Sequence, residues 1–350
     1  MHLQTAPPPA APRRVERGPG HAAQASTDLS FIELQFHGAL ATGTRRDLPP
    51  FLGATLRGAF GYALKALVCQ VAHGQCHRCL LRAACPYAGV FEGLGASDRQ
   101  IMRRYPQVPQ PFVLLLPGPG EEDPDGRELR WGLRLFGSAR RYWPYAVYAL
   151  QTACDRGLGR QRRRVQLHTV CDAATGSTVW SDSGADDGGA TEPMAQAIDA
   201  ASLTAEPEAP VTLRWCFHTP LRIRRDGQLN PRALSGLDLL QAARRRYTTM
   251  LHCYGEGEAR DVDDGRWLER DEFEAVARRV RPWGFDRWSG RQQRRMRLDG
   301  LCGELTIRAP WARAAAAIAA APVLHLGKAT SFGFGRVSWQ RVDTQETDER

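Results

Sequence analysis

Lysine is almost absent from this chain of 350 residues, in which only Lys65 and Lys328 are lysines. Lysine and arginine together number 47 against 38 aspartates and glutamates, so the formal net charge of +9 comes almost entirely from arginine. Because a guanidinium group holds phosphate through paired donors, an acidic polymer, most simply nucleic acid, is the first partner to consider. A GC-rich genome that encodes arginine by default would give the same composition, so composition alone leaves both explanations open.

Long apolar runs are also missing from the sequence. No segment approaches about 18 consecutive apolar residues, which excludes a transmembrane helix. The N-terminus lacks the charged, apolar and small-residue pattern of a signal peptide. We therefore expect a cytoplasmic protein, and its length favours two domains of ordinary size.

Composition divides the chain into two ordered units separated by an acidic stretch. Residues 1–28 are rich in proline, alanine and glycine and lack apolar periodicity, which predicts a disordered tail. Residues 172–210 contain eight acidic residues and no lysine or arginine, which indicates a flexible linker or insertion. The expected N-terminal domain covers residues 29–171, the expected C-terminal domain covers residues 211–342, and residues 343–350 form a short tail.

Strand-like and helix-like patterns alternate in both units. The expected strands are 31–36, 112–116, 129–136, 165–170, 211–215, 323–326 and 336–339, and the expected helices are 51–64, 146–153, 236–251 and 270–280. The long apolar runs typical of parallel sheets are missing. The sequence therefore predicts an α+β fold, in which each sheet carries helices on one face.

The first expected helix has one apolar face, which carries Leu56, Phe60 and Leu64 at helical spacing. Gly58 and Gly61 lie in the same helix and weaken it by roughly 1 kcal/mol each relative to alanine. We expect another backbone or a ligand to come close to the helix at these glycines.

Four of the nine cysteines are crowded together with gaps of six, two and five residues. They are Cys69, Cys76, Cys79 and Cys85. An odd count in an intracellular chain argues against disulfides. Four thiolates on short loops can close around one metal, so we predict a four-iron four-sulfur cluster or a structural zinc, with unligated thiols as the alternative. Such a closed centre would hold the fold rather than catalyse a reaction.

The cysteine spacing resembles the iron–sulfur loop of helix-hairpin-helix base-excision glycosylases. A DNA repair enzyme is therefore a rival interpretation. That class of enzyme also needs a catalytic aspartate after a glycine-rich hairpin in a helical fold. We find no such segment in this chain.

Two basic segments favour contact with nucleic acid. Residues 281–297 hold six arginines against one aspartate, and Trp283, Phe285 and Trp288 are interleaved with them. Guanidinium groups can hold phosphates while aromatic rings stack on bases, as single-stranded nucleic acid requires. Residues 160–164 contain a second run of four arginines. A solvated basic face with tryptophans in the core is the alternative interpretation.

A glycine-rich run, His325-Leu326-Gly327-Lys328-Ala329-Thr330-Ser331-Phe332-Gly333-Phe334-Gly335-Arg336, lies near the C-terminus. It matches neither the phosphate-binding loop of nucleotide hydrolases nor the dinucleotide fingerprint. It combines backbone freedom with one lysine, one arginine and one histidine. Such a loop can lie along a phosphate backbone, because glycine allows close approach.

These motifs together resemble the CRISPR-associated pre-crRNA processing endoribonucleases of the RAMP superfamily. The resemblance rests on residues 56–61, 85–87, 91–92, 135–137, 157–160, 288–292, 300–303 and 325–336. It implies tandem ferredoxin-like (RRM-like) domains, with a cysteine-rich metal-binding loop in the first. It also implies metal-independent cleavage of CRISPR repeat RNA, in which a ribose 2′-hydroxyl attacks the adjacent phosphate to give mature guide RNAs.

The resemblance also suggests site residues. A group with a pKa near neutrality is needed for proton transfer, and the candidates are His325, beside the glycine-rich run, and His37, after the first strand. The expected RNA contacts are Arg57, Arg291, Lys328, Ser331, Phe332, Phe334 and Arg336. The expected partners are repeat RNA or crRNA and possible CRISPR effector subunits, because a non-cleaving RNA-binding subunit of the same superfamily would show the same surface.

Overall fold

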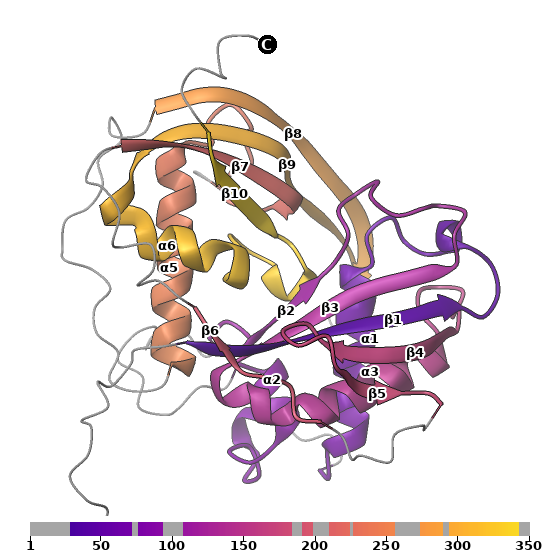
Figure 1. The fold of residues 1–350 in the computed structure, drawn as a ribbon. Coiled ribbons are helices and arrows are strands. Elements are labelled where there is room, and N and C mark those ends of the chain that lie inside the picture. The colour runs from indigo at the N-terminus through magenta and orange to yellow at the C-terminus, as the bar shows by residue number, and fades with distance from the viewer. Residues whose placement is uncertain are drawn as a thin grey trace, which may run out of the picture.

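The computed structural model describes residues 29–71, 76–93, 108–183, 191–198, 210–224, 227–255, 274–289 and 294–342 of the chain. These residues form two α+β halves, each with one antiparallel sheet and its own helices (Figure 1). Within the described ranges, no helix combines the length and apolar character needed to cross a membrane.

The first half is built on a six-stranded sheet with the order β2-β3-β1-β4-β5, and β6 pairs with the start of β1. Its strands are β1 (Ser30–Leu40), β2 (Phe112–Leu115), β3 (Glu128–Phe136), β4 (Val165–Asp172), β5 (Thr178–Ser181) and β6 (Gln196–Ala197). Its helices are α1 (Gly53–Val68), α2 (Pro86–Phe91) and α3 (Trp143–Arg156). Strand alternation places Leu34 and Phe36 of β1 in the same buried cluster as Leu56 and Phe60 of α1.

The second half is built on a four-stranded sheet with the order β10-β7-β9-β8. Its strands are β7 (Pro210–Leu221), β8 (Glu274–Ser289), β9 (Arg294–Pro310) and β10 (Val337–Arg341), and its helices are α5 (Gly236–Tyr254) and α6 (Trp311–Leu324). Trp215 of β7, Leu305 of β9 and Ile318 of α6 are fully buried in its core.

The two halves repeat one topology. Each contains a β-α-β-β-α-β unit, formed by β1-α1-β2-β3-α3-β4 in the first half and β7-α5-β8-β9-α6-β10 in the second. In both units the fourth strand lies beside the first, followed by the third and the second. This is the ferredoxin-like arrangement. The predicted α+β class with two sheets is confirmed.

A third apolar cluster joins the halves. Phe31 and Phe136, on the face of the first sheet opposite α1, pack against Met250 and Leu251 of α5 and Leu324 of α6. Beside this cluster Arg134 pairs with Glu33 and donates to the carbonyl oxygens of Pro322 and Val323 at the end of α6. The first sheet is therefore covered by its own helices on one face and partly by helices of the second half on the other.

Three sequence predictions about local structure are wrong. Part of the expected acidic linker forms β5 and β6, whose pairing with β4 and β1 extends the first sheet. Residues 274–280 of the expected helix belong to the strand β8, because they pair with β9. The expected strand at 323–326 is the end of α6 and the turn that follows it.

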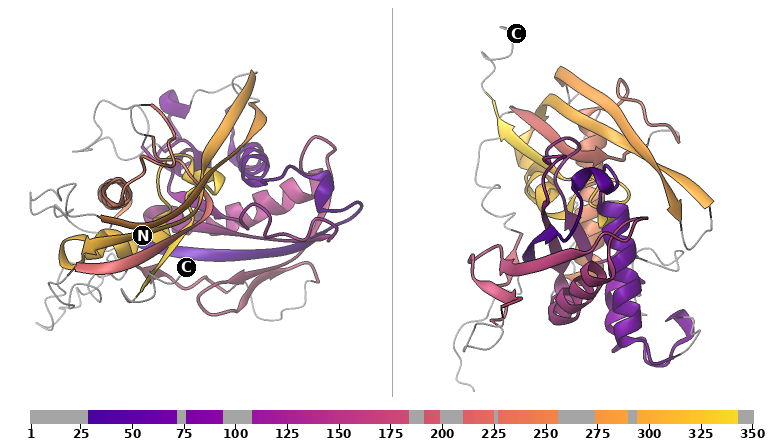
Figure 2. Two further views of the ribbon diagram at one scale, coloured as in Figure 1. Left: turned by 90° about the horizontal axis from the view of Figure 1, so that it is seen from above. Right: turned by 90° about the vertical axis from the view of Figure 1, so that its right-hand side faces the viewer.

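A long hairpin formed by β8 and β9 reaches from the second sheet to α1 of the first half (Figures 1 and 2). Its end is fixed there by aromatic contacts, since Trp283 and Phe285 both pack on Phe51, with ring centroids 5.9 and 6.2 Å away. We call the paired residues 283–289 and 294–300 the hairpin arm.

Candidate nucleic-acid interface

A groove of about 1540 Å³ lies between α1, the turn that follows α3, and the hairpin arm. We call it the arginine groove. Its charged lining residues are Arg156, Arg160, Arg162, Arg287 and Arg295, with Asp286 as the one carboxylate. The two basic segments that the sequence singled out are far apart in the chain, and the fold brings them to one surface. Their joint positive field favours an anionic polymer.

The floor of the arginine groove is helix α1. Gly58 lies there, and a Cβ atom built on it would have no neighbour within 4 Å. Gly61 is different, because a Cβ there would come within 2.5 Å of the Phe91 ring. Gly61 therefore allows the Phe91 ring to pack against α1, whereas Gly58 leaves the backbone of α1 exposed to the groove.

A second hollow of about 730 Å³ continues the groove along α1. Gly58, Tyr62 and Ala66 line both spaces, so the hollow and the groove meet over this helix. Tyr62 is 72% exposed, and the guanidinium of Arg156 lies 5.8 Å from its ring centroid. An exposed ring beside a cation can stack on a base. Tyr62 was not among the predicted site residues. Its position opposite the predicted apolar face of the helix was the signal that could have indicated an exposed ring.

Lys65 also lines this hollow, with its Nζ atom 5.5 Å from the ring centroid of Tyr87. The pKa of Tyr87 is raised above its ordinary value by burial and by the neighbouring carboxylate of Glu92, which accepts its hydrogen bond. The Tyr87 phenol therefore stays protonated at neutral pH. In the sequence Lys65 stands out only as one of two lysines. Its position beside the hollow is clear only in the structure.

Two aromatic residues of the hairpin arm contribute to the contact between the halves. Trp283 and Phe285 are partly buried against the core of the first half and hold the arm in place. Phe285 also lines the arginine groove, so the stacking role predicted for this segment stays a prediction. Arg291 and the side chain of Trp288 lie outside the described residues.

The glycine-rich run (residues 325–336, here called the glycine loop) lies between the two halves. Phe334 is fully buried in the core of the first half, with its ring 5.3 Å from Phe51. The hydroxyl of Thr219 donates to the carbonyl of Gly333 at 2.7 Å and accepts from the amide of Arg336 at 2.9 Å. The RNA contact predicted for Phe334 stays a prediction that this placement does not favour, because its ring is enclosed by protein.

Arg57 fastens α1 to the glycine loop. Its guanidinium lies over the ring of Phe332 at 4.4 Å and donates to Ser331 Oγ and to Gln110 Oε1, both at 3.1 Å. Three predicted site residues, Arg57, Ser331 and Phe332, thus meet in one place. Arg57 also lies over the Phe91 ring at 5.0 Å, and Arg287 of the hairpin arm lies over the Phe332 ring at 4.9 Å. These contacts hold α1, the glycine loop and the hairpin arm together, and the RNA contacts predicted for the three residues stay predictions.

Two other predicted phosphate contacts remain available at the ends of the glycine loop. Lys328 is exposed. Arg336 forms a partly exposed ion pair with Glu121 at 3.3 Å. Their roles in RNA binding stay predictions.

His325 is fully buried at the start of the glycine loop. Its backbone has φ +58°, and its Nδ1 lies 3.2 Å from the carbonyl oxygen of Phe334. Burial lowers the pKa of His325 well below its ordinary value, and the guanidinium groups of Arg134, Arg336 and Arg246 lower it further. The ring is therefore neutral and donates from Nδ1. Its burial prevents direct contact with RNA in this conformation, which argues against the predicted catalytic role.

This burial predicts acid sensitivity. Below the unfolded-state pKa of about 6.5 the unfolded chain takes up a proton that folded His325 does not, so stability falls as pH falls, by up to about 1.4 kcal/mol per pH unit. We expect urea unfolding of His325→Asn to show a weaker decline between pH 6.5 and 5, because asparagine tolerates positive φ and does not titrate there. The exposed His168, changed to Asn, is the matched control and keeps the wild-type decline. Identical pH profiles for His325→Asn and wild type would contradict the prediction.

His37, the other candidate for proton transfer, lies on β1 between the buried Phe36 and Gly38. Strand alternation directs it to the face of the first sheet away from α1, opposite Arg130 and Thr169. It does not line the arginine groove or the adjoining hollow. A catalytic role for His37 stays a prediction that this placement does not favour.

The four crowded cysteines lie at the end of α1 and in the segment that leads to α2. All four are partly buried and unbridged. Burial raises the pKa of the Cys76 thiol, and the nearby Glu92 adds to this effect. Among the residues that the structure describes, no group of three or more ligand-type side chains converges on one point. The predicted metal centre therefore stays a prediction.

The repeated ferredoxin-like unit and the arginine groove define a tandem ferredoxin-like protein with a basic surface. Residues 216–337 match the family model of the CRISPR-associated endoribonuclease Cas6. Residues 29–192 match a second model, AF_1859_N, described as an N-terminal domain. The resemblance identified from the sequence is confirmed.

Individual proteins are also similar to this chain. An uncharacterized protein of Archaeoglobus fulgidus is 30% identical over 133 residues, which cover 38% of this chain and 44% of that protein. A Cas6 product complex shares the fold with a TM-score of 0.50 and 18% identity, over 89% of this chain and 100% of the other. A partial Cas6-RT-Cas1–Cas2 complex matches with a TM-score of 0.52 and 12% identity, over 90% of this chain and 47% of the other.

Proposed function

We propose that this protein binds CRISPR repeat RNA in the arginine groove and cleaves it without a metal ion to release guide RNAs. The observation that carries this proposal is the convergence of two basic segments, one after α3 and one on the hairpin arm, over the bare backbone of α1. The match of residues 216–337 to the family model of the endoribonuclease Cas6 supports RNA as the anionic polymer.

The reaction needs no group outside the RNA and the protein. The ribose 2′-oxygen loses its proton and attacks the adjacent phosphorus, the bond to the 5′-oxygen breaks, and that oxygen takes up a proton. The products are a 2′,3′-cyclic phosphate and a 5′-hydroxyl. Fixed cations that face the pentavalent phosphate stabilise its extra negative charge, and a held geometry aligns attack with departure.

The groups available for this chemistry are those of the arginine groove and its adjoining hollow. The residues that line these two spaces include no histidine in the described part of the chain. Tyr62 and Lys65, one helical turn apart on α1, are lining groups that can pass a proton to the departing oxygen, and the arginines supply the cations. We therefore assign proton donation to Tyr62 and Lys65 in place of His325.

The test is incubation of the purified chain with its own repeat transcript in EDTA. We expect cleavage, with a cyclic phosphate on one product and no cleavage when the scissile nucleotide carries a 2′-deoxyribose. Lys65→Met and Tyr62→Phe should reduce the single-turnover rate by about 10²–10⁴-fold with little change in RNA affinity. His37→Ala is the comparison variant, and it tests the proton-transfer role that the sequence predicted for His37.

A non-cleaving RNA-binding subunit is the second candidate, and the observation that favours it is the lack of histidine among the described groove residues. Tight binding without cleavage would establish this function and overturn the nuclease proposal. Absence of both binding and cleavage would overturn the two together.

We also propose that Cys69, Cys76, Cys79 and Cys85 bind a structural metal when the loop closes around it. Elemental analysis of the purified protein for iron and zinc decides this, with the double variant Cys76→Ser/Cys79→Ser as the comparison. A metal content below one atom per chain in wild type would overturn it.

A further inference from the structure

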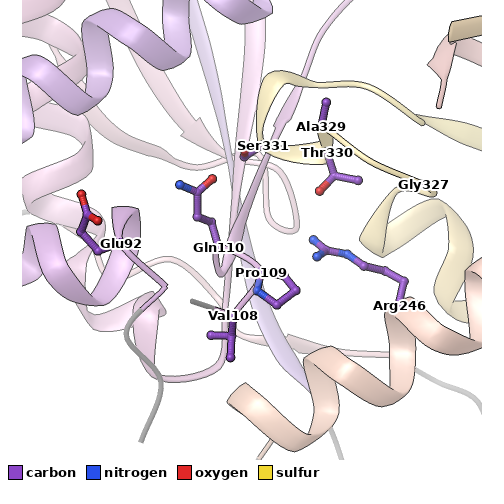
Figure 3. Close-up of a pocket in the computed structure, with 9 residues that line it drawn as sticks. All are labelled: Glu92, Val108, Pro109, Gln110, Arg246, Gly327, Ala329, Thr330 and Ser331. Carbon is purple, nitrogen blue, oxygen red and sulfur yellow. The ribbon is translucent and has the colours of Figure 1, made fainter. Parts of the chain in front are cut away.

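A cavity of about 360 Å³ lies at the boundary of the two halves, beyond the wall formed by Gln110 and Ser331. Figure 3 shows its lining, which comes from four places: the end of α2, the segment before β2, helix α5, and the glycine loop. We call it the Arg246 cavity after the one cation that lines it. Its wall on the side of the glycine loop is largely main chain, because Gly327 and Ala329 have minimal side chains.

Arg246 projects from α5 into this cavity (Figure 3). Its Nε atom donates a hydrogen bond to the carbonyl oxygen of Leu324 at 3.4 Å. Its Nη2 atom is shielded from solvent and has no hydrogen-bond partner among the described residues. Burial lowers the pKa of Arg246 to about 10, so the group is still charged at neutral pH.

A largely buried cation that has no carboxylate partner among the described residues is unfavourable unless something else compensates it. The carboxylate that lines the cavity, Glu92, lies at the far side from Arg246, with Gln110 between them (Figure 3). Glu92 also accepts a hydrogen bond from Tyr87. The other polar group next to Arg246 is the hydroxyl of Thr330, a neutral donor (Figure 3). The surroundings of the guanidinium therefore suit an anion that enters from outside.

The cavity is connected to the proposed RNA path. Glu92 and Gln110 line both the cavity and the hollow beside α1, and that hollow shares Gly58, Tyr62 and Ala66 with the arginine groove. The three spaces thus follow one another across α1, from the hairpin arm to α5. A strand bound in the groove can continue toward Arg246.

We propose that the Arg246 cavity binds a phosphate group, that Arg246 is its counter-ion, and that this phosphate belongs to the RNA strand held in the arginine groove. The assignment of this phosphate to the RNA strand rests on the proposed function. A phosphate matches the paired donors of a guanidinium and accepts a hydrogen bond from Thr330 at the same time.

The first experiment uses inorganic phosphate and the full chain. We expect the unfolding temperature of wild type to rise with phosphate beyond the change in potassium chloride of equal ionic strength, because a ligand that binds only the folded state stabilises it. Arg246→Gln should lose this rise, and Arg246→Lys should keep part of it. Arg245→Gln, which removes an exposed arginine from the same helix, is the matched control and should behave as wild type.

The same variants separate binding from a structural role. Without phosphate, Arg246→Gln should unfold at the wild-type temperature or above it, because the change removes an uncompensated charge. A lower unfolding temperature, together with an unchanged response to phosphate, would show that Arg246 supports the fold and would overturn the proposal.

The second experiment measures RNA affinity at several salt concentrations. For a single strand each neutralised phosphate contributes about 0.7 to the slope of log K against log salt, so Arg246→Gln should reduce the slope by about this amount. A phosphate-dependent stabilisation with an unchanged slope would overturn the assignment to the RNA backbone and indicate a free or terminal phosphate. If wild type binds no RNA, the proposed function fails, while the phosphate experiment still decides whether the cavity holds an anion.

Discussion

Replacing Phe334 with alanine is expected to lower the free energy of unfolding by about 3–5 kcal/mol, the usual loss for a buried phenylalanine. Phe334 belongs to the glycine loop of the second half, yet its ring is fully buried in the core of the first. It packs on Phe51, which also contacts Trp283 of the hairpin arm. The substitution therefore removes a contact on which the position of the loop, the arm and α1 depends.

Urea unfolding followed by circular dichroism measures this loss. Tyr148→Ala, which truncates a 57% exposed aromatic residue on α3, is the matched control and should change stability by less than about 0.5 kcal/mol. We also expect Phe334→Ala to separate the unfolding of the two halves into two steps. Wild-type stability and a single unfolding transition in Phe334→Ala would show that the Phe334 ring does not hold the two halves together.

Removing three arginines from the groove is expected to weaken RNA binding by about 100-fold or more, since three contacts of about 1 kcal/mol each multiply to that factor. The variant is Arg160→Gln/Arg162→Gln/Arg295→Gln, which combines both basic segments at exposed positions. The affinity should fall for every RNA sequence, because phosphate contacts carry no sequence information. The slope of log K against log salt should fall by about 2.

The matched control changes the net charge equally at exposed arginines outside the groove: Arg130→Gln/Arg232→Gln/Arg308→Gln. Filter binding of labelled repeat RNA at three salt concentrations compares the two variants. If both lose affinity equally, the effect is one of total charge and the groove is not the binding surface. If neither loses affinity, RNA binds elsewhere on the molecule.

The amino-acid pattern predicted the elements whose periodicity is set by one buried face. Helix α1 and strand β1 each bury one side, so their apolar spacing was informative. Helix α6 was missed because it contacts two cores: Ile318 faces the second half, while Leu324 faces the cluster between the halves. A helix that is apolar on both sides has no alternation to detect, although its alanine content was a usable signal.

Tertiary pairing decided the segments that the sequence misassigned. Residues 274–280 have a helix-like pattern, and it is their register with β9 that makes them a strand. Phe334 lies between two glycines, which suggests an accessible loop, and its burial depends on Phe51, nearly three hundred residues earlier in the chain. The groove itself was not predictable, because its two basic segments come together only through the contact between the halves.

The turn after the second helix occupies the same place in both repeated units. In the first unit this turn contains Gly157 and Gly159 with Arg160, and in the second it is the glycine loop. One turn lines the groove and the other holds the halves together. The side chains of the first turn can therefore change without loosening a core, whereas those of the second turn are constrained by packing in both halves.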